Sequence, residues 1–257
     1  MCCLFLAASS TVAIAQTNVV DLVNPIIGTN GMGHTFPGAC VPFGLVQLSP
    51  DTDTIPHNVD GKYQPRSYEY CAGYQHKDSS IVGFSHTHFS GTGHSDLGDI
   101  LIMPTTGTLK LNPGTATNPD GGYRSRFSHD TEISRPGYYE VMLADYGVKA
   151  QLTTTQRAGI HKYTYPTNSE NQRIILDMIH GIYNYDGKVL WTNIRVENDT
   201  LVTGYRITNG WARTNYTYFA MSFSKPITHY GCEEKAKVNY RGGYAKFNMK
   251  ENFPDIG

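Results

Sequence analysis

The sequence has little net charge, no closely spaced cysteine pair and, after its first fifteen residues, no long apolar run. A formal charge of −1 over 257 residues gives no basic field for nucleic acid or anionic lipid. The absence of a Cys-x-x-Cys pair makes a cysteine-type zinc site improbable. Without a further apolar run there is no candidate transmembrane helix. We therefore predict neither a nucleic-acid nor a membrane partner.

Several catalytic templates are also missing. The sequence holds no Gly-x-Ser-x-Gly elbow, no phosphate-binding loop and no dinucleotide fingerprint that opens a helix. It also lacks a convincing amphipathic helix of about ten residues or more. These absences argue against serine hydrolases of the elbow type, nucleotide-dependent enzymes and helical folds.

Many short strands and turns are what the sequence does contain. The 18 tyrosines, 10 phenylalanines and 26 glycines favour strands joined by tight turns. Period-two alternation predicts strands over 43–48, 81–89, 100–103, 139–145, 148–154, 160–165, 173–178, 189–196, 201–207, 216–223, 235–240 and 244–249. Turn pairs at Tyr146-Gly147, Asn198-Asp199 and Gly242-Gly243 predict hairpins. The predicted fold is all-β, a large antiparallel β-sandwich.

The two ends of the sequence have their own patterns. Residues 1–15 combine a short apolar stretch with a small-x-small motif at Ala13-Ile14-Ala15, which predicts a signal peptide and an exported protein, periplasmic or extracellular. The domain expected is 16–257. It retains Cys40, Cys71 and Cys232, for which one disulfide or three thiols are both open. Residues 253–257 read as the middle of a loop, so we expect a sandwich truncated at its C-terminal end.

The run from Gly83 to Ile100 is the most informative segment. Alternation places Val82, Phe84, His86 and His88 on one face of a strand, and a loop rich in glycine, serine and threonine follows. Polar imidazoles at a strand end beside such a loop are typical of a functional site on a rigid sheet. Three roles are open for these histidines. We favour contact with a ligand or domain; the others are structural hydrogen bonding and metal ligation together with His94 and Asp96.

Other segments near this run share its composition. Asp96 and Asp99 could form an acid–base pair, although bonds to backbone donors of the glycine-rich turn are the favoured role. Gly31 to Gly38 holds a polar tip, His34, among glycines that allow close backbone approach. An aromatic cluster that suits a sugar platform, or simply packs a loop, consists of Tyr68, Tyr70, Tyr74 and His76.

Three sequence blocks together resemble the N-terminal domain of glycoside hydrolase family 92, the calcium-dependent exo-acting α-mannosidases of Bacteroidetes. The first block runs from Val23 through Gly33-His34-Thr35-Phe36-Pro37-Gly38 to Asp51. The second comprises Cys71-Ala72-Gly73-Tyr74 and Ile81 to Thr105. The third, weaker block comprises Arg135-Pro136-Gly137-Tyr138-Tyr139, 146–150 and 161–163.

The resemblance implies a galactose-mutarotase-like β-sandwich that packs against a C-terminal (α/α)6 barrel, which this sequence lacks. Family members invert configuration, and their general acid, general base and most calcium (Ca²⁺) ligands come from the helical domain. No catalytic residue and no metal ligand is therefore carried over to this chain. The partners implied are mannose-containing glycans, most of all α-1,2-linked ones, and the helical domain of the intact enzyme.

The resemblance leaves this chain the sandwich's share of the substrate cleft. The substrate-binding residues expected are His34, Tyr68, Tyr70, Cys71, Tyr74, His86, His88, Ser90, Gly91, Thr92 and Asp96. Two other functions stay open, a non-catalytic carbohydrate-binding sandwich and a metal-dependent hydrolase built on His86-x-His88. The fragment alone is expected to be inactive as a mannosidase.

Overall fold

The structure is a computed structural model that describes residues 18–53, 55–91, 93–94, 96–182, 185, 187–236 and 243–250, with the backbone alone at 232–236 and 243–250. Some predicted features lie outside the described residues. These are the signal peptide at 1–15, Thr92, the first residue of the Gly242-Gly243 turn and residues 253–257. No helix among the described residues is long and apolar enough to cross a membrane.

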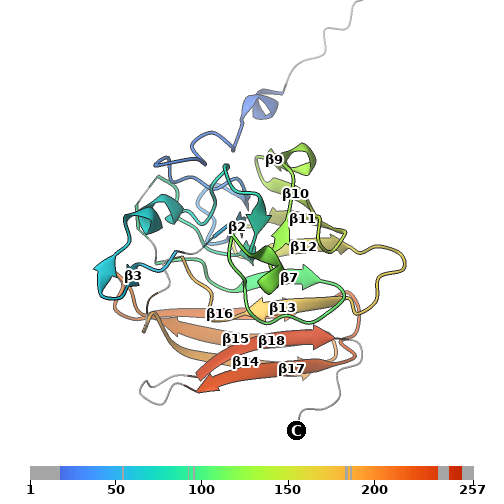
Figure 1. Cartoon of the computed structure of the whole chain (residues 1–257). Coiled ribbons are helices and arrows are strands. Elements are labelled where there is room, and N and C mark those ends of the chain that lie inside the picture. Colours follow the sequence, from blue (N-terminus) through green and yellow to red (C-terminus); the bar gives the residue numbers. More distant parts are fainter. Residues whose placement is uncertain are drawn as a thin grey trace, which may run out of the picture.

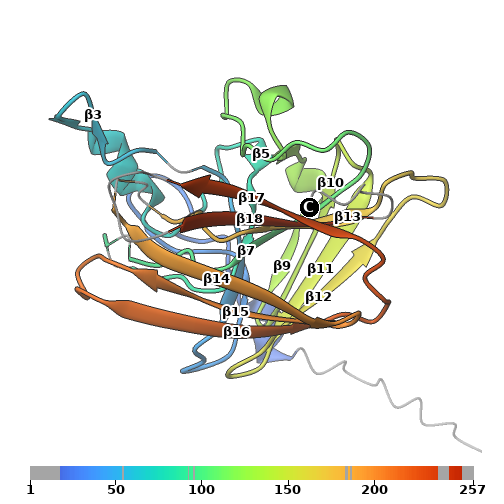
Figure 2. The ribbon, with the colours of Figure 1, turned by 90° about the horizontal axis from the view of Figure 1, so that it is seen from below.

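Three antiparallel sheets form three layers (Figures 1 and 2). The seven-stranded middle sheet has the order β1-β2-β6-β7-β13-β18-β17. Its strands are β1 (Ala39–Cys40), β2 (Gln47–Asp51), β6 (Gly83–Ser85), β7 (Leu101–Thr105), β13 (Arg173–Asp177), β17 (Tyr230–Ala236) and β18 (Gly243–Lys250). The prediction of an all-β, antiparallel fold is confirmed.

A smaller sheet lies on each side of the middle one. The four-stranded sheet has the order β12-β11-β10-β9 and contains β9 (Ile133–Arg135), β10 (Tyr138–Leu143), β11 (Val148–Thr154) and β12 (Gly159–Thr164). The three-stranded sheet contains β14 (Val189–Asn198), β15 (Leu201–Thr208) and β16 (Asn215–Ser222). The short elements are β3 (Asn58–Val59), β4 (Lys62–Tyr63), β5 (Ser80–Ile81), β8 (Ser125–Arg126) and the 3-10 helices η1 (Val19–Leu22), η2 (Pro65–Tyr70), η3 (Pro119–Gly121) and η4 (His129–Thr131).

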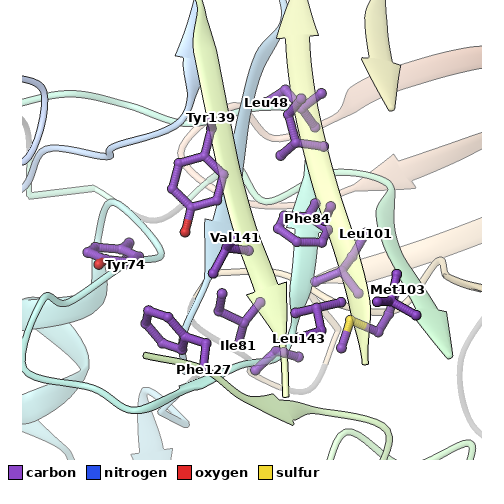
Figure 3. Close-up of a cluster of buried hydrophobic side chains, with 14 of the residues drawn as sticks. Leu48, Tyr74, Ile81, Phe84, Leu101, Met103, Phe127, Tyr139, Val141 and Leu143 are labelled. Carbon is purple, nitrogen blue, oxygen red and sulfur yellow. The ribbon is translucent and has the colours of Figure 1, made fainter. Parts of the chain in front are cut away.

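Side chains of the middle sheet alternate between two hydrophobic cores. Leu101 and Met103 of β7 join the core shared with the four-stranded sheet, whereas Ile102 joins the core shared with the three-stranded sheet. Figure 3 shows the first of these cores, with Phe84 and Leu101 facing Val141 and Leu143. Because β7 is buried on both faces, its first four residues form a continuous apolar run rather than an alternating one.

Several predicted strands have different bounds in the structure, and two of these differences affect the site. The strand expected over 235–240 overlaps β17 at 235–236, and residues 237–240 lie outside the described residues. The strand expected over 43–48 begins at Gln47 instead, because Phe43 has a positive φ of 59° and lies fully exposed. The strand expected over 81–89 is divided into β5 and β6 and ends at Ser85. His86 and His88 therefore follow the strand rather than belong to it, and the predicted alternation does not reach them.

Candidate functional site

A partly exposed aromatic patch lies where two loops meet at η2, with the Tyr68 ring at the surface and the His34 ring buried beneath it. We call His34, Tyr68, Gly91 and Gly93 the Tyr68 patch. The rings of His34 and Tyr68 pack edge to face at 4.8 Å, and Gly91 N donates to His34 O at 2.5 Å. A Cβ on Gly93 would lie 2.0 Å from the Tyr68 hydroxyl oxygen, so only glycine lets this loop approach the ring. Tyr68 keeps 39% of its surface exposed.

The Tyr68 patch also carries an unpaired polar atom. His34 Nε2 is buried and has no hydrogen-bond partner among the described residues. The His34 backbone has a positive φ of 50°, which is uncommon for a residue other than glycine. Ser90 lies exposed next to Gly91. An exposed phenol ring beside an unsatisfied imidazole nitrogen suits a polyhydroxylated ligand, which offers C–H faces for stacking and hydroxyl groups for hydrogen bonds.

Three other expected site residues lie inside the protein. Tyr70 is 2% exposed, and its hydroxyl donates to Asp78 Oδ1 at 3.1 Å. Tyr74 is 1% exposed and donates to Glu132. Cys71 is fully buried and packs against Ile182. The tyrosine cluster thus divides into one surface ring, Tyr68, and two rings that hold the loop to the core.

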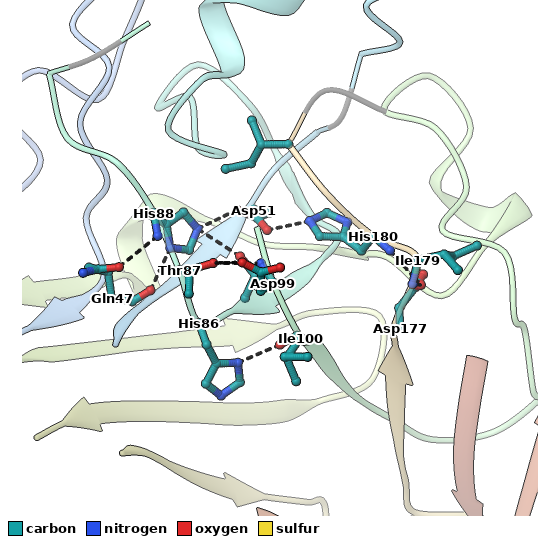
Figure 4. Close-up of polar contacts among 12 residues, drawn as sticks. Gln47, Asp51, His86, Thr87, His88, Asp99, Ile100, Asp177, Ile179 and His180 are labelled. Atoms are coloured by element: carbon teal, nitrogen blue, oxygen red, sulfur yellow. Dashed lines mark hydrogen bonds and ion pairs between the residues drawn. The ribbon is translucent and has the colours of Figure 1, made fainter. Parts of the chain in front are cut away.

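Asp51, at the end of β2, binds two buried imidazoles, and we call Asp51, His88 and His180 the Asp51 network (Figure 4). His88 Nε2 lies 2.8 Å from Asp51 Oδ1, and His180 Nε2 lies 2.7 Å from Asp51 Oδ2. A Cβ on Gly73 would lie 2.0 Å from Asp51 Oδ1, so the loop that carries Gly73 packs directly on this carboxylate. The network joins loops that are far apart in sequence.

The hydrogen-bond partners determine the charge of the Asp51 network. Burial alone would raise the pKa of Asp51, but the facing His88 and His180 lower it below its ordinary value. The carboxylate is therefore ionised and accepts both hydrogen bonds. His88 Nδ1 lies 2.7 Å from Gln47 O, a carbonyl that only accepts. His88 Nδ1 thus faces a carbonyl and Nε2 faces the carboxylate, with Ser85 Oγ a further contact at 3.1 Å from Nε2, which is the geometry of a buried ion pair with Asp51.

His86 belongs to a separate and neutral set of contacts. Its Nδ1 donates to Ile100 O at 2.6 Å, and its Nε2 lies 3.0 Å from His161 Nε2 on β12. His161 Nδ1 lies 2.7 Å from the Tyr163 hydroxyl. We call His86, His161 and Tyr163 the His86 chain. Burial lowers the pKa of His86 to about 4 and that of His161 well below its ordinary value.

The directions of the bonds in the His86 chain follow from this neutrality. Because Ile100 O accepts from His86 Nδ1, a neutral His86 must accept at Nε2. His161 then donates from Nε2 and accepts the Tyr163 proton at Nδ1. Both nitrogens of His86 are thus taken up within the protein. Figure 4 shows the His86 and His88 rings pointing away from each other.

A second buried ion pair fixes the loop that follows His88. Asp99 Oδ1 lies 2.9 Å from Arg206 Nε, and both side chains are inaccessible to solvent. Thr87 donates to Asp99 Oδ2 at 2.7 Å, and Arg206 donates to His180 O at 2.6 Å. Lys188 is buried nearby and donates to Ile182 O. Burial, helped by the charge of Arg206, lowers the pKa of Lys188 to about 7.

Asp96 binds the backbone of the loop between β15 and β16 rather than that of the glycine-rich turn in which it was expected to bond. Its carboxylate accepts from Trp211 N at 2.9 Å and from Ala212 N at 3.1 Å, both in the connection between β15 and β16. His94 Nδ1 lies 3.3 Å from Asp96 Oδ1, and its ring packs 4.4 Å from that of Trp211. Trp211 keeps 76% of its surface exposed. Asp96 and Asp99 are therefore each engaged with separate partners rather than with one another.

Sequence reasoning missed several residues of this region. Asp51, His180, Arg206 and Trp211 were not among the expected site residues. Asp51 has a visible signal, because it is the carboxylate that ends the first block resembling the family. The other three come from segments that pair with distant loops, which periodicity does not reveal.

Comparison with known proteins gives a family match over most of the chain. The glycosyl hydrolase family 92 N-terminal domain matches residues 22–253. The chain belongs to this family. The family GH92 alpha-mannosidase BT3965 from Bacteroides thetaiotaomicron, solved in complex with mannoimidazole, is 39% identical over 91% of this chain, with a TM-score of 0.78. The same enzyme without that ligand gives a TM-score of 0.77.

Two further proteins are also similar to this chain. The GH92 family glycosyl hydrolase ccman5 is 23% identical with a TM-score of 0.68, which supports the fold. An uncharacterized secreted glycosidase from Arthroderma benhamiae is 29% identical over 170 residues, 63% of this chain and 19% of that protein. The chain spans 30% of the length of the Bacteroides thetaiotaomicron mannosidase and matches the N-terminal domain of the family.

Proposed function

We propose that this chain is the N-terminal sandwich portion of an exported, inverting exo-α-mannosidase that removes terminal α-1,2-linked mannose from glycans. Membership of family 92 and the 39% identity to an α-mannosidase support the reaction class. Similarity to a protein described as a secreted glycosidase supports export. The observation that carries the role of this portion is the Tyr68 patch, an exposed ring with an unsatisfied imidazole nitrogen beside it.

The proposed division of labour follows from what the carboxylates of this region do. Inverting hydrolysis needs a carboxylic acid and a carboxylate about 6.5–9.5 Å apart, with room for a water molecule between carboxylate and sugar. Asp51 and Asp99 are held in buried ion pairs, and Asp96 accepts two backbone N–H groups. We therefore assign acid and base to the helical domain of the intact enzyme. The Asp51 network positions the loops that carry the Tyr68 patch.

The binding of calcium is assigned to the helical domain for a similar reason. Among the described residues, the one group of three side chains close enough to share a cation contains two histidines, His76 and His129, with Glu132. Calcium takes oxygen ligands, so this group does not suit it. We propose that calcium, when present in the intact enzyme, is held by the helical domain, where it would contact mannose hydroxyls.

The proposal is tested with a chimera. This chain replaces the matching N-terminal portion of the Bacteroides thetaiotaomicron enzyme, and the chimera and the chain alone are assayed on α-1,2-, α-1,3- and α-1,6-mannobiose. We expect turnover by the chimera alone, fastest on the α-1,2 disaccharide, with β-mannose as the first product by proton NMR. Turnover by the isolated chain, or a folded but inactive chimera, would contradict the proposal.

A non-catalytic carbohydrate-binding role is the second candidate, and Trp211 favours it. Its ring is 76% exposed and packs beside His94, an arrangement that suits stacking on a sugar. Calorimetric titration of the isolated chain with mannose and mannobiose decides the matter. Saturable binding that is lost in Trp211→Ala, together with an inactive chimera, would favour this second role. The arrangement of His86 and His88 in separate networks does not favour a metal-dependent hydrolase built on that pair.

A further inference from the structure

We propose that His76, His129 and Glu132 form a binding site for a divalent transition-metal cation, with zinc as the expected occupant. Each of the three offers a ligand atom, and these atoms all lie within 4.8 Å of one another. The two imidazole rings are 4.0 Å apart, and His129 Nδ1 lies 2.6 Å from Glu132 Oε2. The site involves neither the Tyr68 patch nor the Asp51 network and goes beyond the proposed function.

An unsatisfied nitrogen provides an independent reason to expect a ligand. His76 Nδ1 is buried and has no hydrogen-bond partner among the residues that the structure describes. A buried polar atom without a partner costs free energy, and a metal ion would remove that cost by accepting the nitrogen lone pair. The segment that carries it is fixed, because His76 N donates to Thr29 O at 2.8 Å.

The carboxylate of the site is held in place by a second layer of contacts. The Tyr139 hydroxyl donates to Glu132 Oε1 at 2.7 Å, and the Tyr74 hydroxyl lies 2.9 Å and 3.0 Å from the two carboxylate oxygens. Only 3% of the Glu132 side chain is exposed, whereas 38% of the His129 side chain is. Outer contacts of this kind orient metal ligands and tune their affinity. The exposed His129 leaves a route of entry from solvent.

The ligand set selects the metal. Two imidazoles and one carboxylate match the three protein ligands of zinc sites that keep a fourth position for water. Calcium and magnesium prefer oxygen ligands and are disfavoured here. Binding would replace the proton shared by His129 and Glu132 and would join η4 to the segment after Tyr74, so the bound metal would stabilise the fold.

Metal binding is measured on the purified full chain after treatment with EDTA and dialysis against zinc chloride. We expect about one zinc per chain by mass spectrometry, and a cobalt-substituted protein with a visible tetrahedral spectrum. His129→Ala and His76→Ala should each weaken zinc binding by at least about tenfold, because loss of a ligand exceeds the effect of losing an outer contact. His57→Ala, on a different segment, is the matched control and should bind as the unaltered chain does.

The outcomes separate the site from adventitious binding. Zinc should raise the melting temperature of the chain and of His57→Ala, but not of His129→Ala, and millimolar calcium should not displace it. His129 is partly exposed, so His129→Ala is expected to fold, and its melting curve in EDTA checks this. Zinc retained equally by His129→Ala, or no zinc bound by the unaltered chain, would overturn the proposal.

Discussion

His86 and His88 are two residues apart, yet their rings occupy opposite electrostatic environments. His86 is neutral and lies between sheets in a chain of hydrogen bonds that ends at a tyrosine. His88 is charged and forms a buried ion pair with Asp51. The end of β6 at Ser85 produces the difference, because the backbone after it turns and sends the two rings in different directions. A His-x-His pattern alone does not distinguish these situations.

The comparison also shows how each environment is stabilised. The His86 chain needs no charge, since each donor meets one acceptor in a fixed order. The Asp51 network is costly to desolvate and is retained only because every charge has a partner. Removal of one member should therefore affect the charged network more than the neutral one.

The largest effect is expected from Asp51→Asn. The amide keeps the shape of the carboxylate but leaves the charge of His88 buried without compensation. We expect the free energy of unfolding to fall by about 3–5 kcal/mol. Urea unfolding followed by circular dichroism measures it. Asp130→Asn, at an exposed position, is the matched control and should change stability by less than about 0.5 kcal/mol. A loss no greater than that of the control would show that the ion pair is not formed.

Between pH 6.5 and 4, the change of stability with pH should come mainly from the neutral His86 chain. Folded His86 stays neutral down to about pH 4, whereas the unfolded side chain takes up a proton near pH 6.5. The unfolded state binds more protons in this window, so stability is full above it and falls as the pH is lowered through it. His86 alone accounts for up to about 3 kcal/mol, at about 1.4 kcal/mol per pKa unit.

The double variant His86→Gln/His161→Gln tests this assignment. Its unfolding free energy should vary less between pH 6.5 and 5 than that of the unaltered chain, while His57→Gln should follow the unaltered chain. The contribution of Asp51 to stability is lost at lower pH. Its lowered pKa keeps the carboxylate charged until the pH falls below the ordinary range of a carboxyl group. An unchanged slope in the double variant would mean that these two histidines are not the neutral pair.

Much of the fold could be predicted from the sequence, but less of the site. Alternation along 139–145 and 148–154 predicted β10, which ends at Leu143, and β11, because each strand has one buried face. The positive φ at Phe43 and the end of β6 at Ser85 depend on tertiary contacts that a local pattern does not contain. Tyr70 and Tyr74 could not be separated from Tyr68 for the same reason, since their partners Asp78 and Glu132 lie outside the motif.

The smallest effect is expected from Tyr163→Phe, which tests the order of donors in the neutral chain. Ile100 O holds the proton on His86 Nδ1, so His86 Nε2 can only accept and His161 must keep its proton on Nε2. Loss of the phenol then leaves the His161 Nδ1 lone pair buried without a donor. We expect a loss of about 1–3 kcal/mol, less than that of Asp51→Asn.

Nitrogen NMR of the His161 ring sharpens the test. In the unaltered chain the Nδ1 resonance should be that of an unprotonated nitrogen accepting a hydrogen bond, and in Tyr163→Phe that of a free lone pair, with Nε2 protonated in both. Tyr216→Phe, on a ring that is 56% exposed, is the control for the loss of a hydroxyl and should change neither stability nor spectrum. A proton found on His161 Nδ1 in the unaltered chain would reverse the order of donors. The chain would then require a charged ring at His86 or His161, and the contrast between a neutral and a charged histidine two residues apart would disappear.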